Sequence, residues 1–239
     1  MSDPGHVLAV CRVHQLRTDQ GAVGVTAIDK RPVNGPVMVR ELGLYGDVQA
    51  DRQHHGGPDQ AVYAFSQEET AFWSVELGRA IDPGAFGENL RTVGVAVDDA
   101  ELGERWRVGE ELLLEVTAPR VPCAVFGRWV EQPAWVRRFT ERGRPGAYLR
   151  VLHRGAVTAG DTVRVVQRPG HGVTVAGWFS GNTAQDARTL VEFSGDTGWA
   201  LSPAMRTQVD RSLRRAARQA AGQWPGATPD SSGRRASTQ

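Results

Sequence analysis

The residue with the most distinctive chemistry is Cys123, which ends the run APRVPC at residues 118–123. The run follows a predicted strand, and Pro119 and Pro122 end that strand and make the loop after it rigid. The guanidinium of Arg120, three residues before the thiol, favours the thiolate form. A thiolate can act as a nucleophile, a sulfur carrier or a ligand for a soft metal. A small buried hydrophobic residue is the competing interpretation, and these residues alone leave both open.

The other thiol and the single lysine carry weaker predictions. Cys11 lies inside a predicted strand without comparable neighbours, so we expect it in the core. Two cysteines so far apart, with no CxxC pair, exclude a disulfide framework and a cysteine-rich zinc site. Lys30 could form a Schiff base with a pyridoxal cofactor, but no phosphate-binding loop lies beside it in the sequence. We interpret it as a surface or anion-contacting lysine.

A second polar run, GDVQADRQHHGGPDQ, covers residues 46–60. His54 and His55 are adjacent and would point to opposite sides of an extended chain, so at most one of them faces a given site. Their spacing matches no zinc motif. Gly56 and Gly57 could present backbone N–H groups to an anion. On spacing alone, a polar loop with tight turns is the favoured interpretation.

Two shorter runs give weaker signals. In GAFGENL, at residues 84–90, Gly87 relaxes the backbone before Asn89, whose carboxamide is both a donor and an acceptor. RPGAYLR, at residues 144–150, places two arginines and Tyr148 near a turn. A turn and a solvated surface are the simpler interpretations of these two runs.

Short runs rich in valine and leucine, bounded by turn residues, predict strands along most of the chain. The predicted strands cover residues 6–15, 24–28, 36–39, 60–65, 89–93, 111–117, 147–152 and 162–167. This many short strands before residue 168 favours a mainly β, barrel-like fold. Two helices interrupt the pattern. The first begins at Ser66, which has capping-box spacing with Glu69, and ends at Gly78; the second begins near Pro133 and closes at Gly143.

After residue 170 the pattern changes to helices. Three are predicted, over residues 174–179, 183–193 and 202–221. The final segment is rich in glycine, proline, serine and threonine and has little to bury, so we expect disorder there. The predicted organisation is a β-barrel domain at 1–170, a small all-α module at 171–221 and a disordered tail at 222–239.

The charge balance excludes some classes of partner. The 239 residues include 28 basic and 27 acidic side chains, for a net charge of +1. That balance argues against a generic binder of nucleic acid or of anionic membranes. No apolar stretch is long enough to span a membrane, and the N-terminus has no leader pattern. We therefore expect a cytoplasmic protein with reduced thiols.

Taken in order, five runs resemble the MOSC domain family, which is named after the C-terminal domain of molybdenum cofactor sulfurases. They are GDVQADRQHHGGPDQAVYAF, GAFGENL, GERWRVGE, LEVTAPRVPC and WVRRFTERGRPGAYLRV. The likeness is greater to the YiiM-type branch, which appends three helices after the barrel. Because five separated runs occur in family order, the resemblance is specific, and it covers the chain apart from its C-terminal tail.

The resemblance implies a barrel-like fold whose cleft holds a pyranopterin molybdenum cofactor. Cys123 matches the family's signature cysteine, which ligates molybdenum in relatives such as the mitochondrial amidoxime reducing component. Arg120 would then suit the phosphate of the cofactor. The other cofactor-binding positions that the resemblance implies are His55, Gly56, Gly57, Asp59, Ser66, Asn89 and Tyr148. Gln60 departs from the family pattern, since many relatives carry lysine there, and this departure could weaken anion binding or change substrate preference.

The resemblance also implies an activity, namely the reduction of N-hydroxylated compounds such as hydroxylaminopurine-type bases or amidoximes. No flavin or haem motif is visible, in particular no GxGxxG after a strand, so electrons would come from a separate reductase. Two alternatives stay open. One is a carrier of sulfur, as a Cys123 persulfide, or of the cofactor itself. The other is a non-catalytic binding protein that docks through the three-helix module, a possibility motivated by Gln60 and by the arginine-rich last helix. A solvated helix face is the simpler interpretation of those arginines.

Overall fold

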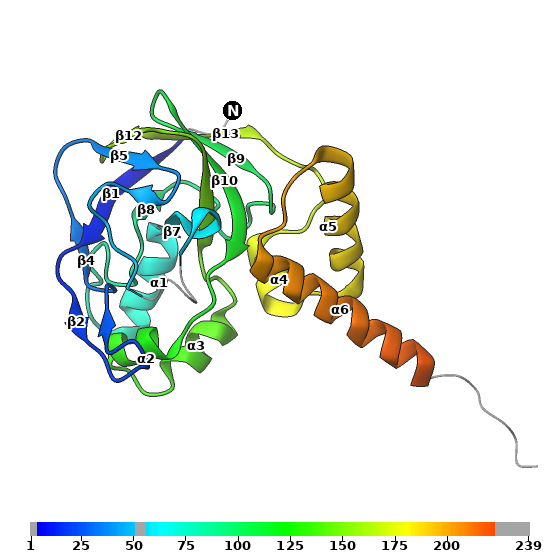
Figure 1. Cartoon of the computed structure of the whole chain (residues 1–239). Helices are drawn as coiled ribbons and strands as arrows, with labels where there is room; N and C mark the ends of the chain where they lie inside the picture. The colour runs from blue at the N-terminus through cyan, green and yellow to red at the C-terminus, as the bar shows by residue number, and fades with distance from the viewer. Residues whose placement is uncertain (1–3, 51–55, 223–239) are drawn as a thin grey trace, which may run out of the picture.

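The computed structural model describes residues 4–50 and 56–222, and its centre is a closed β-barrel (Figure 1). Within these residues, seven strands form the ring in the order β1, β13, β9, β10, β11, β7, β8 and back to β1. Their bounds are β1 Gly5–Val13, β7 Val62–Ser66, β8 Leu90–Val93, β9 Arg105–Val108, β10 Leu112–Pro119, β11 Ala147–His153 and β13 Thr162–Gln167. The predicted mainly β, barrel-like fold is confirmed.

Shorter strands border the barrel. β4 (Lys30–Pro32) pairs with β1 outside the ring. A small sheet contains β5 (Val37–Arg40), β6 (Gly43–Leu44) and β12 (Gly155–Val157). A hairpin joins β2 (Arg17–Thr18) to β3 (Val25–Thr26), and a short 3-10 helix, η1 (Pro58–Gln60), leads into β7.

The β7–β8 pair is parallel, whereas the other pairs of the ring are antiparallel. A parallel pair needs a crossover connection, and helix α1 (Gln67–Leu77) lies in this one. The hydroxyl of Ser66 accepts a hydrogen bond from the backbone N–H of Glu69 at 3.2 Å and so caps the first turn. Gly78 ends the helix with φ at 61°. The predicted helix between Ser66 and Gly78 is confirmed.

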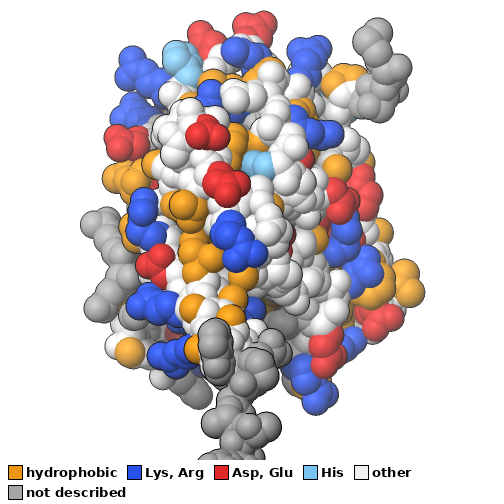
Figure 2. Space-filling model, turned by 90° about the vertical axis from the view of Figure 1, so that its right-hand side faces the viewer, with side chains coloured by type: hydrophobic (Ala, Val, Ile, Leu, Met, Phe, Trp, Pro, Cys, Tyr) orange, Lys and Arg blue, Asp and Glu red, His pale blue; other side chains and the backbone are white. Residues whose placement is uncertain are grey.

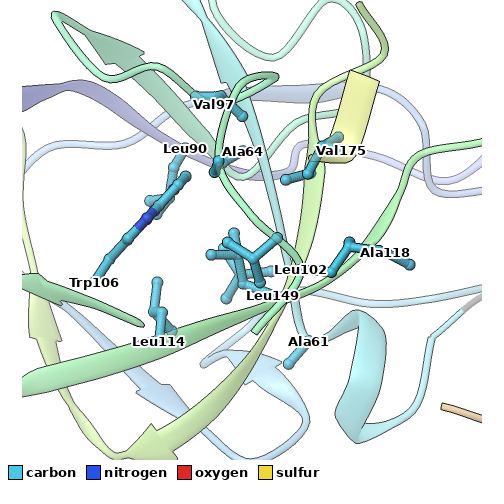
Figure 3. Close-up of a cluster of buried hydrophobic side chains, with 14 of the residues drawn as sticks. Ala61, Ala64, Leu90, Val97, Leu102, Trp106, Leu114, Ala118, Leu149 and Val175 are labelled. Carbon is cyan, nitrogen blue, oxygen red and sulfur yellow. The ribbon is translucent and has the colours of Figure 1, made fainter. Parts of the chain in front are cut away.

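Alternating side chains fill the barrel (Figure 3). On β9, Trp106 and Val108 are buried, whereas Arg107 between them is exposed, as expected for a strand with one face in a core. Leu114 of β10 and Leu149 of β11 are fully buried beside Trp106 in the same cluster. Burying such a side chain stabilises the fold by roughly 1.5–3 kcal/mol.

A separate cluster of aromatic side chains joins the barrel wall to helices α1, α2 (Ala124–Val130) and α3 (Trp135–Arg142). Its aromatic members are Tyr63, Phe65, Trp73, Phe86, Phe126, Trp135 and Phe139. Several of the rings meet edge to face, with 4.6 Å between the centroids of Trp73 and Trp135. Because α2 begins directly after Cys123, this cluster gives the cysteine loop a rigid support.

Three helices follow the barrel and lie beside it in Figure 1. They are α4 (Val175–Gly181), α5 (Ala184–Thr197) and α6 (Pro203–Gly222), and they confirm the three predicted helices. Their buried side chains, including Trp178, Leu190 and Met205, belong to the same core cluster as the barrel interior. The division into domains at residue 170 stays a prediction. The segment 222–239, predicted to be disordered, lies outside the described residues except for Gly222.

The face that carries α5 and α6 has basic and acidic side chains interspersed with apolar ones (Figure 2). Two arginines of α6 have partners within the protein. Nη2 of Arg214 lies 3.8 Å from Oδ2 of Asp210, and Nη2 of Arg215 donates to the carbonyl of Asn182. Among the described residues, no helix combines the length and the apolar character needed to cross a bilayer.

Some local predictions are wrong. Of the predicted strand at 24–28, only Val25–Thr26 is a strand. The second predicted helix is confirmed as α3, but Pro133 precedes it instead of lying in its first turn, because Ala134 adopts a left-handed conformation with φ at 52° and is the N-cap. Helix α2 was not predicted, and its few residues after a proline-rich loop carry no capping motif. Strand β9 was also missed, because the alternation in RWRV extends over only four residues.

Candidate functional site

A pocket of about 340 Å³ lies at one end of the barrel, between the β2–β3 hairpin, the segments before and after residues 51–55, and the loop from β10 to α2. Its volume is in the usual range for small-molecule sites. The structure brings together five of the predicted site residues on its wall. They are Cys123, Arg120, Asn89, Tyr148 and Gly56. Lys30 and Gln60 line the same pocket.

Cys123 is the N-cap residue of α2 and has extended backbone angles, with φ at −114° and ψ at 171°. The proline-bounded loop therefore turns sharply at the cysteine before the helix starts. The side chain is half-buried, packs against the aromatic cluster and lines the pocket. Cys11, in contrast, is completely buried on β1, and burial raises the pKa of its thiol to about 12. The prediction that Cys11 is a core residue is confirmed.

Arg120 directly follows β10, and its backbone N–H donates to the carbonyl of Gly146 at 3.2 Å. Its side chain is only 6% exposed. The guanidinium carbon lies 3.8 Å from the ring centroid of Phe126 and 5.7 Å from that of Tyr63. The buried Nη1 has no hydrogen-bond partner among the described residues. A buried donor without a partner is costly, so an arginine in this state on a pocket wall is suited to an anionic ligand.

Asn89 uses its carboxamide within the protein. Its Nδ2 donates to Asp47 at 2.8 Å and to the carbonyl of Cys11 at 3.3 Å, and its Oδ1 accepts from the backbone N–H of Tyr63 at 3.1 Å. These contacts join the start of β7 to β1 just where the pocket opens. Lys30 forms an ion pair with the same Asp47 at 2.5 Å, so its charge at the pocket is already balanced.

The loop after residues 51–55 is held by side chains rather than left open. The backbone N–H of Gly56 donates to Oε1 of Gln60 at 3.0 Å, and Gln49 donates to the carbonyl of Gln60 at 3.3 Å. Gly56 has φ at 103°, and a Cβ there would lie 1.7 Å from Oε1 of Gln49. Gln60 therefore fixes this loop through its side chain and its backbone carbonyl. Gly57, with φ at 81°, follows Gly56 but does not line the pocket.

Two predicted site residues lie away from the pocket wall. The carboxylate of Asp59 pairs with Arg150 at 3.0 Å, and the hydroxyl of Ser66 is engaged in capping α1 at Glu69. Neither residue lines the pocket. Their roles in cofactor binding remain predictions. His55 lies outside the described residues.

Two tyrosines line the pocket. Tyr148 of β11 was predicted from the sequence, whereas Tyr63 of β7 was missed because it lay within an ordinary predicted strand. Their ring centroids are 5.5 Å apart. Burial raises the pKa of both phenols, with the nearby Arg120 opposing the rise, so both keep their protons at neutral pH. The hydroxyl of Tyr63 donates to the carbonyl of Pro145 at 2.9 Å.

The β2–β3 hairpin supplies an apolar side of the pocket that the sequence did not reveal. Val23 and Val25 line the pocket and are nearly half exposed. Asp19 on the same hairpin accepts two hydrogen bonds from Arg128 of α2, at 2.9 and 2.6 Å. The hydrogen bonds from Arg128 lower the pKa of Asp19. This ion pair ties the hairpin to the helix that begins beside Cys123.

Comparison with known proteins gives consistent matches. The MOSC domain family model matches residues 51–164. The chain is 35% identical over 150 residues to YflK of Bacillus subtilis, and the match covers 63% of this chain and 67% of YflK. It is 33% identical over 172 residues to a protein named reductase from Gibberella moniliformis, a match that covers 70% of this chain and 30% of that protein.

The fold also matches a solved structure. The crystal structure of YiiM from Geobacillus stearothermophilus superposes with a TM-score of 0.70 at 26% sequence identity. The match covers 88% of this chain and all of that one. The fungal protein is much longer than the part that this chain matches.

Proposed function

Because the chain belongs to the MOSC domain family, we propose that its pocket binds a pyranopterin molybdenum cofactor and that the protein reduces N-hydroxylated compounds. The observation that carries the proposal is the pairing, on one pocket wall, of a half-buried thiol with a buried arginine that lacks a partner for Nη1 among the described residues. The proposed oxidoreductase activity rests on this pairing together with the family membership.

The chemistry of the two side chains fits the cofactor. A thiolate is a soft ligand of the kind that molybdenum accepts, and Cys123 would supply it from a loop held by two prolines. A guanidinium is suited to a phosphate, and Arg120 would bind the anionic end of the pterin. The stacking of Arg120 on Phe126 fixes the direction of the fork before any ligand arrives. Preorganisation of this kind lowers the cost of binding.

The other residues of the pocket would hold and shield the group. Tyr63 and Tyr148 would shield the group from water with their rings, and the protonated hydroxyl of Tyr148 could donate a hydrogen bond to it, whereas that of Tyr63 already donates to the carbonyl of Pro145. Gln60 would keep the glycine loop against the ligand through its contact with Gly56. Asn89 would act indirectly, because its carboxamide already holds Asp47 and the backbone of Tyr63.

When bound, molybdenum would supply two-electron redox chemistry at a single metal. Reduction of an N-hydroxyl group breaks the N–O bond, consumes two electrons and two protons, and releases the reduced amine or amidine and water. We propose that a separate reductase supplies the electrons. The name and the length of the fungal relative, of which the match covers 30%, support an association of this fold with reductase chemistry.

The apolar side of the pocket supports a substrate with a flat, largely uncharged body. Val23 and Val25 of the hairpin would pack on such a body, while its N–O group faces Cys123 across the pocket. Hydroxylaminopurine-type bases and aromatic amidoximes have this form. The Asp19–Arg128 ion pair would keep the hairpin close to the site.

Turnover of an aromatic amidoxime by protein purified from a host that makes the cofactor tests the proposal. With chemically reduced methyl viologen as donor, we expect amidine formation by the wild type and none by Cys123→Ser. Cys11→Ser is the matched control, since it changes the other thiol and leaves the pocket wall intact. Failure of the wild type to turn over any N-hydroxylated probe would contradict the reductase proposal. A labile sulfur adduct on Cys123 without molybdenum, seen by intact mass spectrometry, would favour a sulfur carrier.

A further inference from the structure

Asp98 is a buried carboxyl group that lies outside the pocket, in the segment between β8 and β9. Its side chain is 1% exposed. Its Oδ1 accepts a hydrogen bond from the backbone N–H of Gly146 at 2.8 Å. Gly146 belongs to the turn between α3 and β11.

The peptide group that Asp98 contacts also contacts the pocket. The N–H of Gly146 and the carbonyl of Pro145 belong to the same peptide group, and that carbonyl accepts the hydroxyl hydrogen of Tyr63 at 2.9 Å. The next carbonyl, that of Gly146, accepts the backbone N–H of Arg120 at 3.2 Å. A single turn therefore connects one buried carboxylate to two residues of the pocket wall. Hydrogen bonds in such a chain polarise and strengthen one another.

The turn has little freedom to move. Gly146 has φ at 74°, a conformation that favours glycine, and a Cβ at this position would lie 2.6 Å from the carbonyl oxygen of Ala64. On its other side, the backbone of Asp98 is fixed by the helices after the barrel. The N–H of Ala176 in α4 donates to the carbonyl of Asp98 at 2.8 Å, and the N–H of Val175 donates to that of Ala100 at 2.9 Å.

We propose that Asp98 is a positioning residue that acts through the Pro145–Gly146 peptide to hold Tyr63 and Arg120 in the pose that captures an anion, and that the ionised carboxylate holds them best. The inference rests on the proposed function in one respect, namely that Arg120 binds the anionic end of the ligand. It also gives the helices after the barrel a role, because α4 fixes the segment that carries Asp98.

Burial and the charged groups around Asp98 bring the pKa of its carboxyl group into the range of ordinary buffers. Burial raises the pKa of Asp98 to about 6, opposed by the hydrogen bond from Gly146 and by Arg144, whose Nε lies 4.0 Å away. Glu69 of α1 and the neighbouring Asp99 add to the rise. Tyr63 faces it from β7 in its neutral form, and α4 presents no titratable side chain. Asp98 therefore changes its charge between about pH 5 and 7.

Sulfate binding to the cofactor-free full chain tests the proposal, because sulfate keeps its charge throughout this range. We expect the sulfate affinity of the wild type to fall by about threefold to tenfold between pH 7.5 and 5, the difference between a charge-assisted and a neutral hydrogen bond. Asp98→Asn should bind at the weaker level at both pH values. Asp99→Asn is the matched control, since it removes an adjacent charge that pairs with Arg144 but does not contact Gly146. It should keep a pH dependence of the wild-type size, with its midpoint moved to lower pH because Asp99 no longer adds to the raised pKa of Asp98.

Equal pH profiles for wild type and Asp98→Asn would overturn the proposal, and so would the absence of sulfate binding to the wild type. If Asp98→Asn does not fold, Tyr63→Phe serves as the second variant. It removes the hydroxyl at the other end of the hydrogen-bond chain that runs from Asp98 through the Pro145–Gly146 peptide. The Tyr63→Phe variant should show a smaller pH dependence of sulfate affinity than the wild type. An unchanged dependence would contradict the proposed coupling of Asp98 to the pocket. Sulfate affinity is independent of molybdenum, so a protein that binds sulfate as expected but never loads the metal would contradict only the proposed function.

Discussion

Two buried arginines, one in the barrel wall and one at the pocket, differ in how completely their guanidinium groups are hydrogen-bonded. Arg91 on β8 is completely buried, and its guanidinium donates to Glu88, to Gln67 and to the carbonyl of Asp82. Arg120 at the pocket is nearly as buried, yet its Nη1 has no partner in the part of the chain that the structure describes. A buried charge whose donors are satisfied holds a fold together, whereas one with an unmet donor on a pocket wall is prepared for a ligand.

The two cysteines show the same difference. Cys11 is packed within the barrel wall, where burial raises the pKa of its thiol to about 12 and so keeps it protonated. Cys123 is half-buried on the pocket wall beside Arg120. Position in the fold, not residue type, therefore separates the structural members of each pair from the candidates for function.

Replacing Arg91 should have the largest effect on stability. Arg91→Met leaves the carboxylate of Glu88 buried without its partner, so we expect unfolding to become easier by about 3–5 kcal/mol. Urea denaturation followed by tryptophan fluorescence measures this loss. A change below about 1 kcal/mol would contradict the structural role of Arg91.

Replacing Arg120 should change the stability little and the affinity for an anion strongly. Arg120→Met removes a poorly satisfied charge and keeps an apolar side chain against Phe126, so the free energy of unfolding should change by less than about 1 kcal/mol. Sulfate affinity should nevertheless fall by about a hundredfold, the usual scale for the loss of a charged partner. Isothermal titration calorimetry measures the affinity. A stability loss in Arg120→Met as large as that in Arg91→Met, or a sulfate affinity equal to that of the wild type, would contradict the difference between the two arginines.

The ionised carboxylate of Asp98 should lower the free energy of unfolding near neutral pH. Its pKa is raised to about 6 in the folded chain, so the stability that this shift gives is present in acid and is lost as pH rises through 6. Asp98→Asn avoids this loss. The free energy of unfolding of the variant minus that of the wild type should therefore increase from pH 4 to pH 7, by on the order of 2 kcal/mol. Denaturant titrations at several pH values give the difference, and a constant difference would exclude a raised pKa for Asp98.

The ion pair of the hairpin should have the smallest effect. Asp19→Asn weakens the link to Arg128, so the hairpin should leave the pocket more often and expose Cys123. We expect the rate of alkylation of Cys123 by iodoacetamide to increase by about twofold, the modest scale of an exposed ion pair. Peptide mass spectrometry separates this rate from that of Cys11. An unchanged rate would mean that the hairpin does not limit access to the thiol.

The strands of the barrel and the capped helix α1 could be predicted from the sequence because their signals are local. Valine-rich runs between turns predict strands, and Ser66 with Glu69 marks a helix start. The prolines around Cys123 and Arg120 mark the thiol as a candidate but leave a core role open, and the family resemblance selects it. Tyr63 and Asp98 could not be found, because their significance lies in contacts with a turn that is far away in sequence.

Sequence motifs do not show how particular polar side chains are used within the fold. Ser66 and Asp59 match family runs, yet their side chains are engaged by the first turn of α1 and by Arg150. Asn89 lines the pocket as expected, but its carboxamide is used to join strands. A sequence motif does not tell whether a polar side chain is free for a ligand, because this depends on which partners the fold brings to it.

The molybdenum and pterin content of the protein purified from a host that makes the cofactor tests most directly whether the pocket holds the cofactor through Cys123. We expect a stoichiometric amount of both in the wild type and in Cys11→Ser, and loss of the metal in Cys123→Ser. Absence of molybdenum and pterin from the wild type, or equal loading of Cys123→Ser, would contradict cofactor binding through Cys123.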